Sequence, residues 1–187
     1  EITYGDWSSD VCSSDLQGGH ACRLVHRAAV VSVPYDLAAG ARFLEHGFSR
    51  LYVRHFLGTL RTKALEKLRQ YPGAFDGQRA VQARTFWEFD DAVTAPLHGF
   101  ADAADYYHRS SSAHALRGIR VPTLAMSALD DPIVPVESTA NVVAAARDNS
   151  AIKTHITERG GHVGWVEGAI WPRDYYMEET VVSFLAS

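Results

Sequence analysis

Three short apolar runs along the chain predict buried β-strands. Residues 28–34 (AAVVSVP) and 121–129 (VPTLAMSAL) are almost continuously apolar, and a third run lies near residues 152–157. Continuous rather than alternating apolar residues are typical of strands covered on both faces, as in a parallel sheet. Helical spacing over about 137–147 then predicts a strand, helix, strand unit, and the spacing over 174–185 predicts a final amphipathic helix.

Between the first two runs the pattern changes to helical periodicity. Residues 37–70 predict two or three helices that end before the Tyr-Pro-Gly turn at 71–73. One predicted apolar stripe consists of Leu57, Leu60, Ala64 and Leu68. Residues 80–116 are again helical in character, with breaks expected at Pro96 and Gly99.

The start of the chain lacks any such pattern. Residues 1–16 contain neither the basic start nor the apolar run of a secretory signal. Residues 6–16, DWSSDVCSSDL, instead match the translation of a common short-read sequencing adapter. We therefore interpret residues 1–16 as a non-native leader and residues 17–187 as the C-terminal part of one domain.

Composition narrows the classes of partner. The chain is 47% hydrophobic and 21% charged with a net charge of −4, an ordinary profile for a soluble globular protein. It has no basic stripe for nucleic acid and no apolar run approaching the roughly 20 residues of a membrane span. A protein that acts on small molecules is therefore expected. Cys12 lies in the leader, so Cys22 has no native disulfide partner, which is compatible with a reducing compartment such as the cytoplasm.

Two polar segments directly follow predicted strands. ALDDP (128–132) follows the second strand, and ERGGHVGW (158–165) follows the third. Open α/β sheets build their sites at the carboxyl ends of such strands. An aspartate that accepts a hydrogen bond from His162 would fix its tautomer and stabilise the imidazolium, which are two of the roles in a Ser-Asp-His triad.

The assignment of these residues keeps open alternatives. Asp131 stands directly before Pro132, but nothing else in the residues decides between Asp130 and Asp131. Asp-Asp-Pro is also typical of a plain polar turn, and Gly-Gly-His of a loop with a surface histidine.

The nucleophile of such a triad has no candidate here. In α/β hydrolases the serine precedes the acid and the base and lies in a G-x-S-x-G turn. No such motif occurs, Ser32 falls inside a predicted apolar strand, and the later serines lack flanking glycines. The sequence therefore predicts that the nucleophile is not in this chain.

The chain resembles the YheT-like branch of the α/β hydrolases, relatives of the plant embryogenesis-associated proteins. The likeness covers about residues 24–187. It rests on four blocks in order, AAVVSVPYDLAAGARFLEHGFSRLYVRHFL, FWEFDDAVTAPLHGFADAADYYHRSSSAHAL, VPTLAMSALDDPIVP and TERGGHVGWVEG. The resemblance implies an α/β-hydrolase fold truncated to its last three parallel strands, with a helical cap region at about 37–115 and the nucleophile turn upstream.

The same resemblance implies a function. It suggests a serine hydrolase that cleaves carboxylic esters, either short-chain acyl esters or acylglycerol-like substrates, without a cofactor. Asp131 matches the catalytic acid, with Asp130 as the fallback, and His162 matches the general base. A thioesterase or lipase on the same fold remains an alternative. So does a noncatalytic fragment or binding module, because the serine is absent.

One further group of residues has the side-chain types of a metal site. His98, Asp102, Asp105 and His108 would share one face of a continuous helix, and zinc accepts such ligands. Asp and His on a helical face are more often solvent or capping contacts, and the resemblance gives this block no ligand role. The prediction is therefore that no metal is bound.

Overall fold

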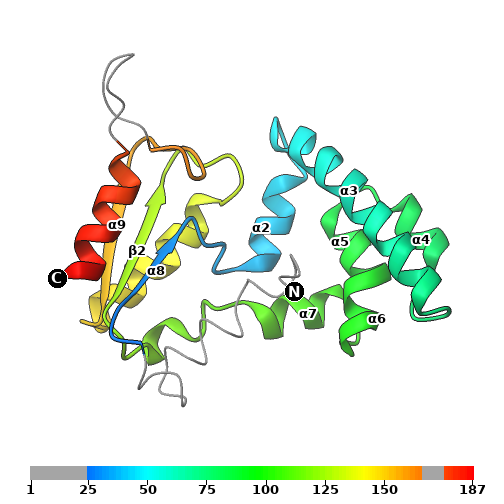
Figure 1. Cartoon of the computed structure of the whole chain (residues 1–187), viewed down its shortest axis with the longest axis horizontal. Coiled ribbons are helices and arrows are strands. Elements are labelled where there is room, and N and C mark those ends of the chain that lie inside the picture. Colours follow the sequence, from blue (N-terminus) through cyan, green and yellow to red (C-terminus); the bar gives the residue numbers. More distant parts are fainter. Residues whose placement is uncertain (1–24, 166–174) are drawn as a thin grey trace. The chain divides into compact units, whose positions relative to one another are not determined.

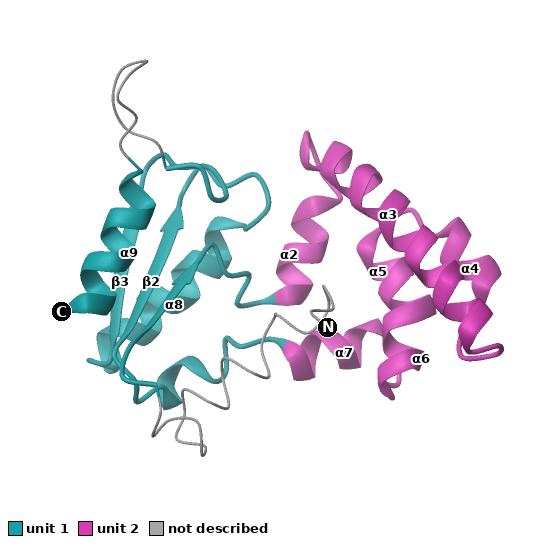
Figure 2. Cartoon of the chain, viewed as in Figure 1, with its two compact units in different colours: residues 1–36, 111–187 teal, residues 37–110 magenta. Residues whose placement is uncertain are grey.

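The structure, a computed structural model, describes residues 25–165 and 175–187 (Figure 1). The predicted leader at 1–16, which contains Cys12, lies outside the described residues. Cys22 lies outside them as well. The chain forms two compact units, one of residues 1–36 and 111–187 and one of residues 37–110 (Figure 2). The second unit begins where the predicted helical region begins, and it ends at Ser110 rather than near residue 115.

The first unit is built on a sheet of three parallel strands, as predicted. Strands β1 (Ala28–Val31), β2 (Thr123–Ala128) and β3 (Ile152–Thr157) are hydrogen-bonded in the order β1-β2-β3. Ala125 in β2 aligns with Val30 in β1 and with Thr154 in β3. The carboxyl ends of the three strands therefore meet at one edge of the sheet.

The apolar run of β2 is explained by cover on both faces. Every residue of β2 is buried. Ala125 packs with Val142 and Ala145 of helix α8 (Val136–Asp148), and the 3-10 turn η3 (Leu116–Gly118) joins this cluster. Met126 and Ala128, on the opposite side of the strand, pack with helix α9 (Tyr176–Ala186). The predicted strand, helix, strand unit is β2, α8 and β3.

Seven helical segments make up the second unit. They are α2 (Leu37–Leu44), α3 (Ser49–Gln70), α4 (Gly77–Gln82), α5 (Phe86–Phe89), the π-helix η2 (Asp90–Thr94), α6 (Ala95–His98) and α7 (Ala103–Ser110). Within the predicted stripe of α3, Leu57 and Ala64 are buried against Phe89 and Val93, and the other two members are partly buried. None of the helices in residues 25–165 or 175–187 combines the length and apolar character that a bilayer crossing requires.

The break expected at Pro96 was wrong. Residues 86–98 run as continuous helix, and the π-turn explains why. The Ala95 N–H donates to the Asp90 carbonyl, five residues back, directly before Pro96. The wider turn accommodates a residue that lacks an N–H and whose ring would clash with the preceding α-turn. The helix ends instead at Gly99, which is left-handed with φ 74°, as predicted.

Candidate active site

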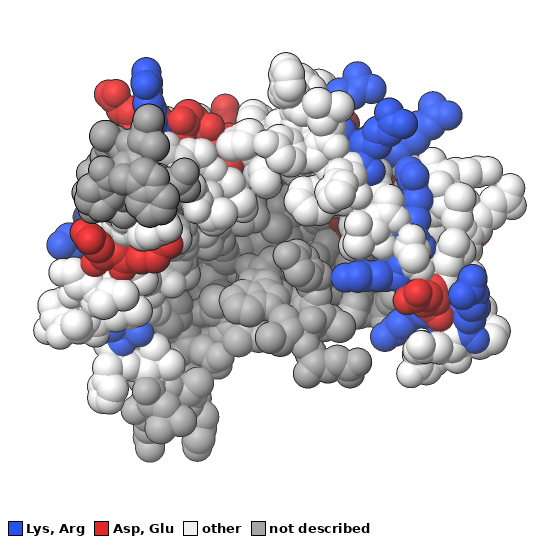
Figure 3. Space-filling view, turned by 45° about the horizontal axis from the view of Figure 1, so that its top comes forward, with Lys and Arg blue, Asp and Glu red and all other residues white. Residues whose placement is uncertain are grey.

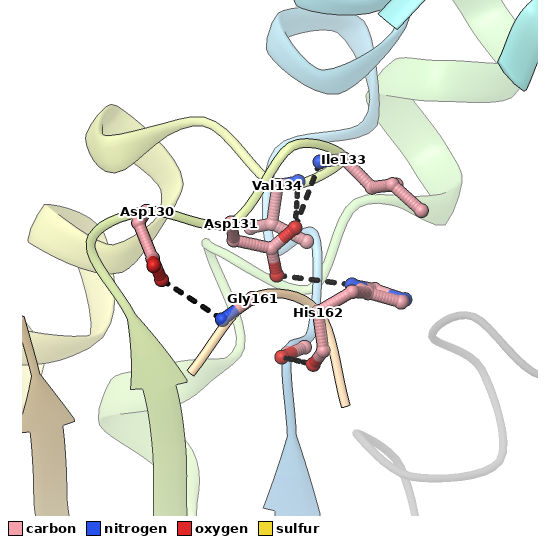
Figure 4. Close-up of polar contacts among 7 residues, drawn as sticks. Asp130, Asp131, Ile133, Val134, Gly161 and His162 are labelled. Atoms are coloured by element: carbon pink, nitrogen blue, oxygen red, sulfur yellow. Dashed lines mark hydrogen bonds and ion pairs between the residues drawn. The ribbon is translucent and has the colours of Figure 1, made fainter. Parts of the chain in front are cut away.

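Asp131 lies in the turn that follows β2, and both oxygens of its carboxylate make polar contacts (Figure 4). Oδ1 accepts hydrogen bonds from the backbone N–H groups of Ile133 at 2.7 Å and Val134 at 3.0 Å. Oδ2 lies 2.9 Å from Nδ1 of His162. The Asp131 side chain is only 1% exposed, so these bonds replace the hydration that the carboxylate loses.

These contacts keep Asp131 ionised. Desolvation, the largest single influence, acts to raise the pKa of Asp131. The hydrogen bonds from His162, Val134 and Ile133 together outweigh it and lower the pKa below its usual value. A buried carboxylate that remains charged can orient an imidazole and stabilise its protonated form.

The turn after β3 presents His162 to this carboxylate. Gly161 has φ 59°, in the left-handed region that glycine adopts without strain. Asp130 Oδ1 accepts the Gly161 N–H at 2.8 Å (Figure 4). The structure therefore brings Asp131, and not Asp130, to the imidazole, while Asp130 fixes the turn that carries it.

Trp165 packs against the same turn and supports it. Its indole N–H donates to Thr157 Oγ1 at 2.7 Å, and the ring is buried with Met126 and Ala128 of β2. A Cβ atom on Gly160 would overlap the Trp165 indole. Gly160 is therefore required for close packing, whereas Gly161 is required for its backbone conformation.

Ser32 holds the His162 turn in a way that sequence reasoning missed. The predicted strand over 28–34 ends early, at Val31, and Ser32 follows it with φ 51°. Ser32 is 3% exposed, and its hydroxyl donates to the backbone carbonyl of His162. Left-handed backbone is uncommon outside glycine and clusters at functional sites. Serine has no sequence signal for this conformation, so the pattern alone could not reveal it.

The far side of the imidazole is open. The His162 side chain is 35% exposed. Its Nε2 atom has no hydrogen-bond partner among residues 25–165 and 175–187. With Nδ1 committed to Asp131, Nε2 is the atom that can take a proton from an attacking hydroxyl.

The residues considered for a metal do not share one helix face, so that step of the prediction was wrong. His98 ends α6, and Gly99 interrupts the helix before α7 begins at Ala103. Asp102 Oδ1 accepts the Asp105 N–H at 2.8 Å, and Asp105 pairs with Arg109 at 3.3 Å, both ordinary helix contacts. Among the described residues, no three His, Cys, Asp or Glu side chains are grouped so that they could hold a metal ion.

Comparison with curated proteins finds relatives among enzymes that act on esters. The chain is 35% identical over 165 residues to YheT of Escherichia coli, whose name marks it as a candidate esterase. It is 31% identical over 160 residues to the mouse phospholipase ABHD3 and 33% identical over 145 residues to the monoacylglycerol lipase of Saccharomyces cerevisiae.

These matches cover 87%, 84% and 74% of this chain but only 48%, 38% and 32% of the relatives. The chain therefore spans about half, or less, of the length of the curated relatives it matches. No family model matches the chain. No solved structure matches it either.

Proposed function

This chain belongs to the YheT-like branch of the α/β hydrolases, and we propose that its parent protein hydrolyses carboxylic esters through an acyl-enzyme intermediate. A serine supplied upstream attacks the ester carbonyl carbon. His162 Nε2 takes the serine proton and then delivers it to the departing alkoxide. Water, deprotonated by the same nitrogen, attacks the acyl-enzyme, and the released serine regains its proton.

One observation carries this proposal, the 2.9 Å contact between His162 Nδ1 and Asp131 Oδ2. Because Asp131 accepts at Nδ1, the neutral imidazole carries its proton there and leaves the Nε2 lone pair free for base catalysis. The positive charge that develops on the ring meets a buried carboxylate whose pKa is already lowered. The two backbone N–H donors hold that carboxylate in place throughout.

The relatives' names support the proposed substrate class. Candidate esterase, phospholipase and monoacylglycerol lipase all name cleavage of a carboxylic ester. We place the substrate among short-chain acyl esters and acylglycerol-like esters. A panel of p-nitrophenyl esters and acyl thioesters of matched chain length distinguishes this assignment from a thioesterase, which would turn over the thioesters faster.

A fluorophosphonate probe tests the mechanism. The chain restored to its relatives' length with its own upstream sequence should be labelled covalently at one serine. His162→Ala in that protein should slow labelling by about 10³-fold or more, because the serine loses its base. Labelling at an unchanged rate in the His162→Ala protein would refute the role given to His162.

A second candidate function concerns the 187 residues by themselves. The open Nε2 atom favours it, because no described hydroxyl is in place to be deprotonated there. On this account the chain alone is a noncatalytic piece of the hydrolase. The probe should then leave the chain unlabelled, and covalent labelling of any of its serines would contradict the account.

A further inference from the structure

The helical unit contains a pocket with an excess of positive charge. The pocket has a volume of about 620 Å³ and is lined by Arg50, Arg54, Arg61 and Arg84. Glu45 is the only carboxylate among the described lining residues. Lys and Arg side chains (blue) gather over this unit in Figure 3. The lining thus carries three more positive than negative charges, even with histidine neutral.

The helix periodicity of α3 explains how three of these arginines meet. Arg50, Arg54 and Arg61 are spaced by four and seven residues, so they lie along one face of α3. Arg84 comes from the connection between α4 and α5. Its backbone is fixed there, because its N–H donates to Glu88 Oε2 at 2.6 Å.

Of the described residues that line the pocket, only the carboxylate of Glu45 could balance the four guanidinium groups. None of these groups forms an ion pair within the part of the chain that the structure describes, whereas Arg79 in the same unit pairs with Asp91 at 2.7 Å. Like charges gathered around a concavity repel one another and concentrate a positive potential in it. The arrangement favours an anion that enters the pocket.

Arg61 supplies a second, independent observation. Its Nη2 donates to the carbonyl of Ala83, the residue directly before the lining residue Arg84. Its Nε is buried and has no hydrogen-bond partner in the described residues. A buried donor without an acceptor is destabilising, and an oxygen of a bound anion would satisfy it.

The same pocket has an apolar side. Leu44, Leu51, Val53 and Leu57 line it together with the arginines. Leu57 and Val53 are buried in the unit's core, while Leu51 is 61% exposed. A ligand that joins an anionic head to an alkyl chain would use both sides of the pocket.

We propose that this pocket binds a phosphate monoester that carries an alkyl chain. A phosphate group has a charge of roughly −1.5 to −2 and three acceptor oxygens, so it can engage several guanidinium groups at once. A carboxylate has one charge and two oxygens, and one arginine already satisfies it. The proposal does not rest on the proposed ester hydrolysis, because it concerns residues of the helical unit alone.

Calorimetric titration of the whole 187-residue chain tests the site with matched ligands. Octyl phosphate, inorganic phosphate and octyl glucoside are each titrated below their micelle-forming concentrations. Octyl phosphate should bind, and the neutral glucoside should not. Inorganic phosphate should bind more weakly than octyl phosphate. If it binds equally well, the anion site is supported and free phosphate is its source.

Two double variants separate the pocket from general electrostatics. Arg50→Gln with Arg54→Gln removes two lining charges, and Lys67→Gln with Arg69→Gln removes two charges from exposed positions of the same helix that do not line the pocket. The first pair should weaken octyl phosphate binding about tenfold or more, and the second less than threefold. Thermal melts without ligand confirm that both variants fold.

Three results would overturn the proposal. They are equal weakening by the two double variants, equal binding of the glucoside and the phosphate, and no binding of either phosphate at millimolar concentration.

Discussion

The two compact units differ in how their charged side chains are partnered. In the sheet unit, Asp131 is 1% exposed yet satisfied by one imidazole and two backbone N–H groups. In the helical unit, four arginines line one pocket with a single carboxylate, Glu45, and form no ion pair with the described residues. The net charges of the two units also differ in sign, because residues 37–110 carry ten Lys and Arg against eight Asp and Glu, while residues 17–36 and 111–187 carry eight against ten.

The difference separates two kinds of site. A carboxylate whose partners are all supplied by the protein is set for chemistry on another group, because its charge is already fixed in place. Guanidinium groups that the protein does not hold in ion pairs are set for binding, because a ligand can supply the counter-charge.

The largest effect is expected on kcat, from a substitution of Asp131, the proposed acid that orients His162. Asp131→Asn in the restored-length protein should lower kcat for a p-nitrophenyl ester by about 10³–10⁴-fold, because the ring loses its charged partner. Asp130→Asn is the matched control and should stay within about tenfold, since an amide oxygen can still accept the Gly161 N–H. Equal losses in steady-state kinetics would remove the distinction between the two aspartates.

The next largest effect is expected on stability, from a substitution where Gly160 packs against the Trp165 indole. Gly160→Ala should lower the free energy of unfolding by about 1–3 kcal/mol, because the added methyl group overlaps the rigid Trp165 indole. Gly58→Ala in α3 is the control from the other unit, where nothing lies within 4 Å of the new atom. It should raise the free energy of unfolding by about 0.5–1 kcal/mol through helix propensity. Urea denaturation measures both, and a neutral Gly160→Ala would mean that the indole can move aside.

The helical unit also has a partly buried carboxylate, that of Asp90, which allows a comparison with Asp131. Asp90 accepts hydrogen bonds from the hydroxyls of Tyr107 and Thr94, both at 2.5 Å. Burial raises the pKa of Asp90, although both bonds act to lower it. Tyr107→Phe should therefore lower the free energy of unfolding by about 1–2 kcal/mol at neutral pH. Tyr71→Phe, at a 57% exposed ring, should leave urea denaturation unchanged, and equal effects would contradict this account.

The pH dependence of stability distinguishes the two carboxylates by sign. The pKa of Asp131 is lowered in the folded protein, so its contribution is present above the unfolded value of about 3.9 and is lost as the pH falls through the folded pKa. The pKa of Asp90 is raised in the folded protein, so its ionisation instead opposes folding. Its contribution to stability falls as the pH rises from the unfolded pKa to the raised folded pKa. Asp131→Asn should therefore flatten the loss of stability between about pH 5 and pH 2. An identical pH slope in wild type and variant would contradict the lowered pKa.

Much of the sheet unit could be predicted because its signals are local. Continuous apolar runs gave the three strands, and the two polar segments after them gave His162 and a pair of aspartates, Asp130 and Asp131, between which the residues did not decide. The residues that support the site could not be found in this way. The left-handed Ser32, the Asp130 bond to Gly161 and the overlap between Gly160 and Trp165 all depend on chain segments that meet only after folding.

The helical unit shows the same limit. Its apolar stripe in α3 was readable, but the π-turn that accommodates Pro96 depends on a backbone bond from Ala95 to Asp90. The arginine pocket joins α3 to the segment before α5, which are 23 positions apart at Arg61 and Arg84. Neither helical periodicity nor residue composition shows that these two segments line one pocket.

The most direct test of the central claim is a double-mutant cycle on the proposed catalytic pair, Asp131 and His162. Asp131→Asn, His162→Ala and the combined variant are compared with wild type in the restored-length protein, with kcat for one p-nitrophenyl ester as the readout. If Asp131 acts only through His162, the double variant should be no slower than His162→Ala alone. Losses that multiply across the two positions would show that the residues act independently, and the account of an Asp131–His162 acid-base pair would then be wrong.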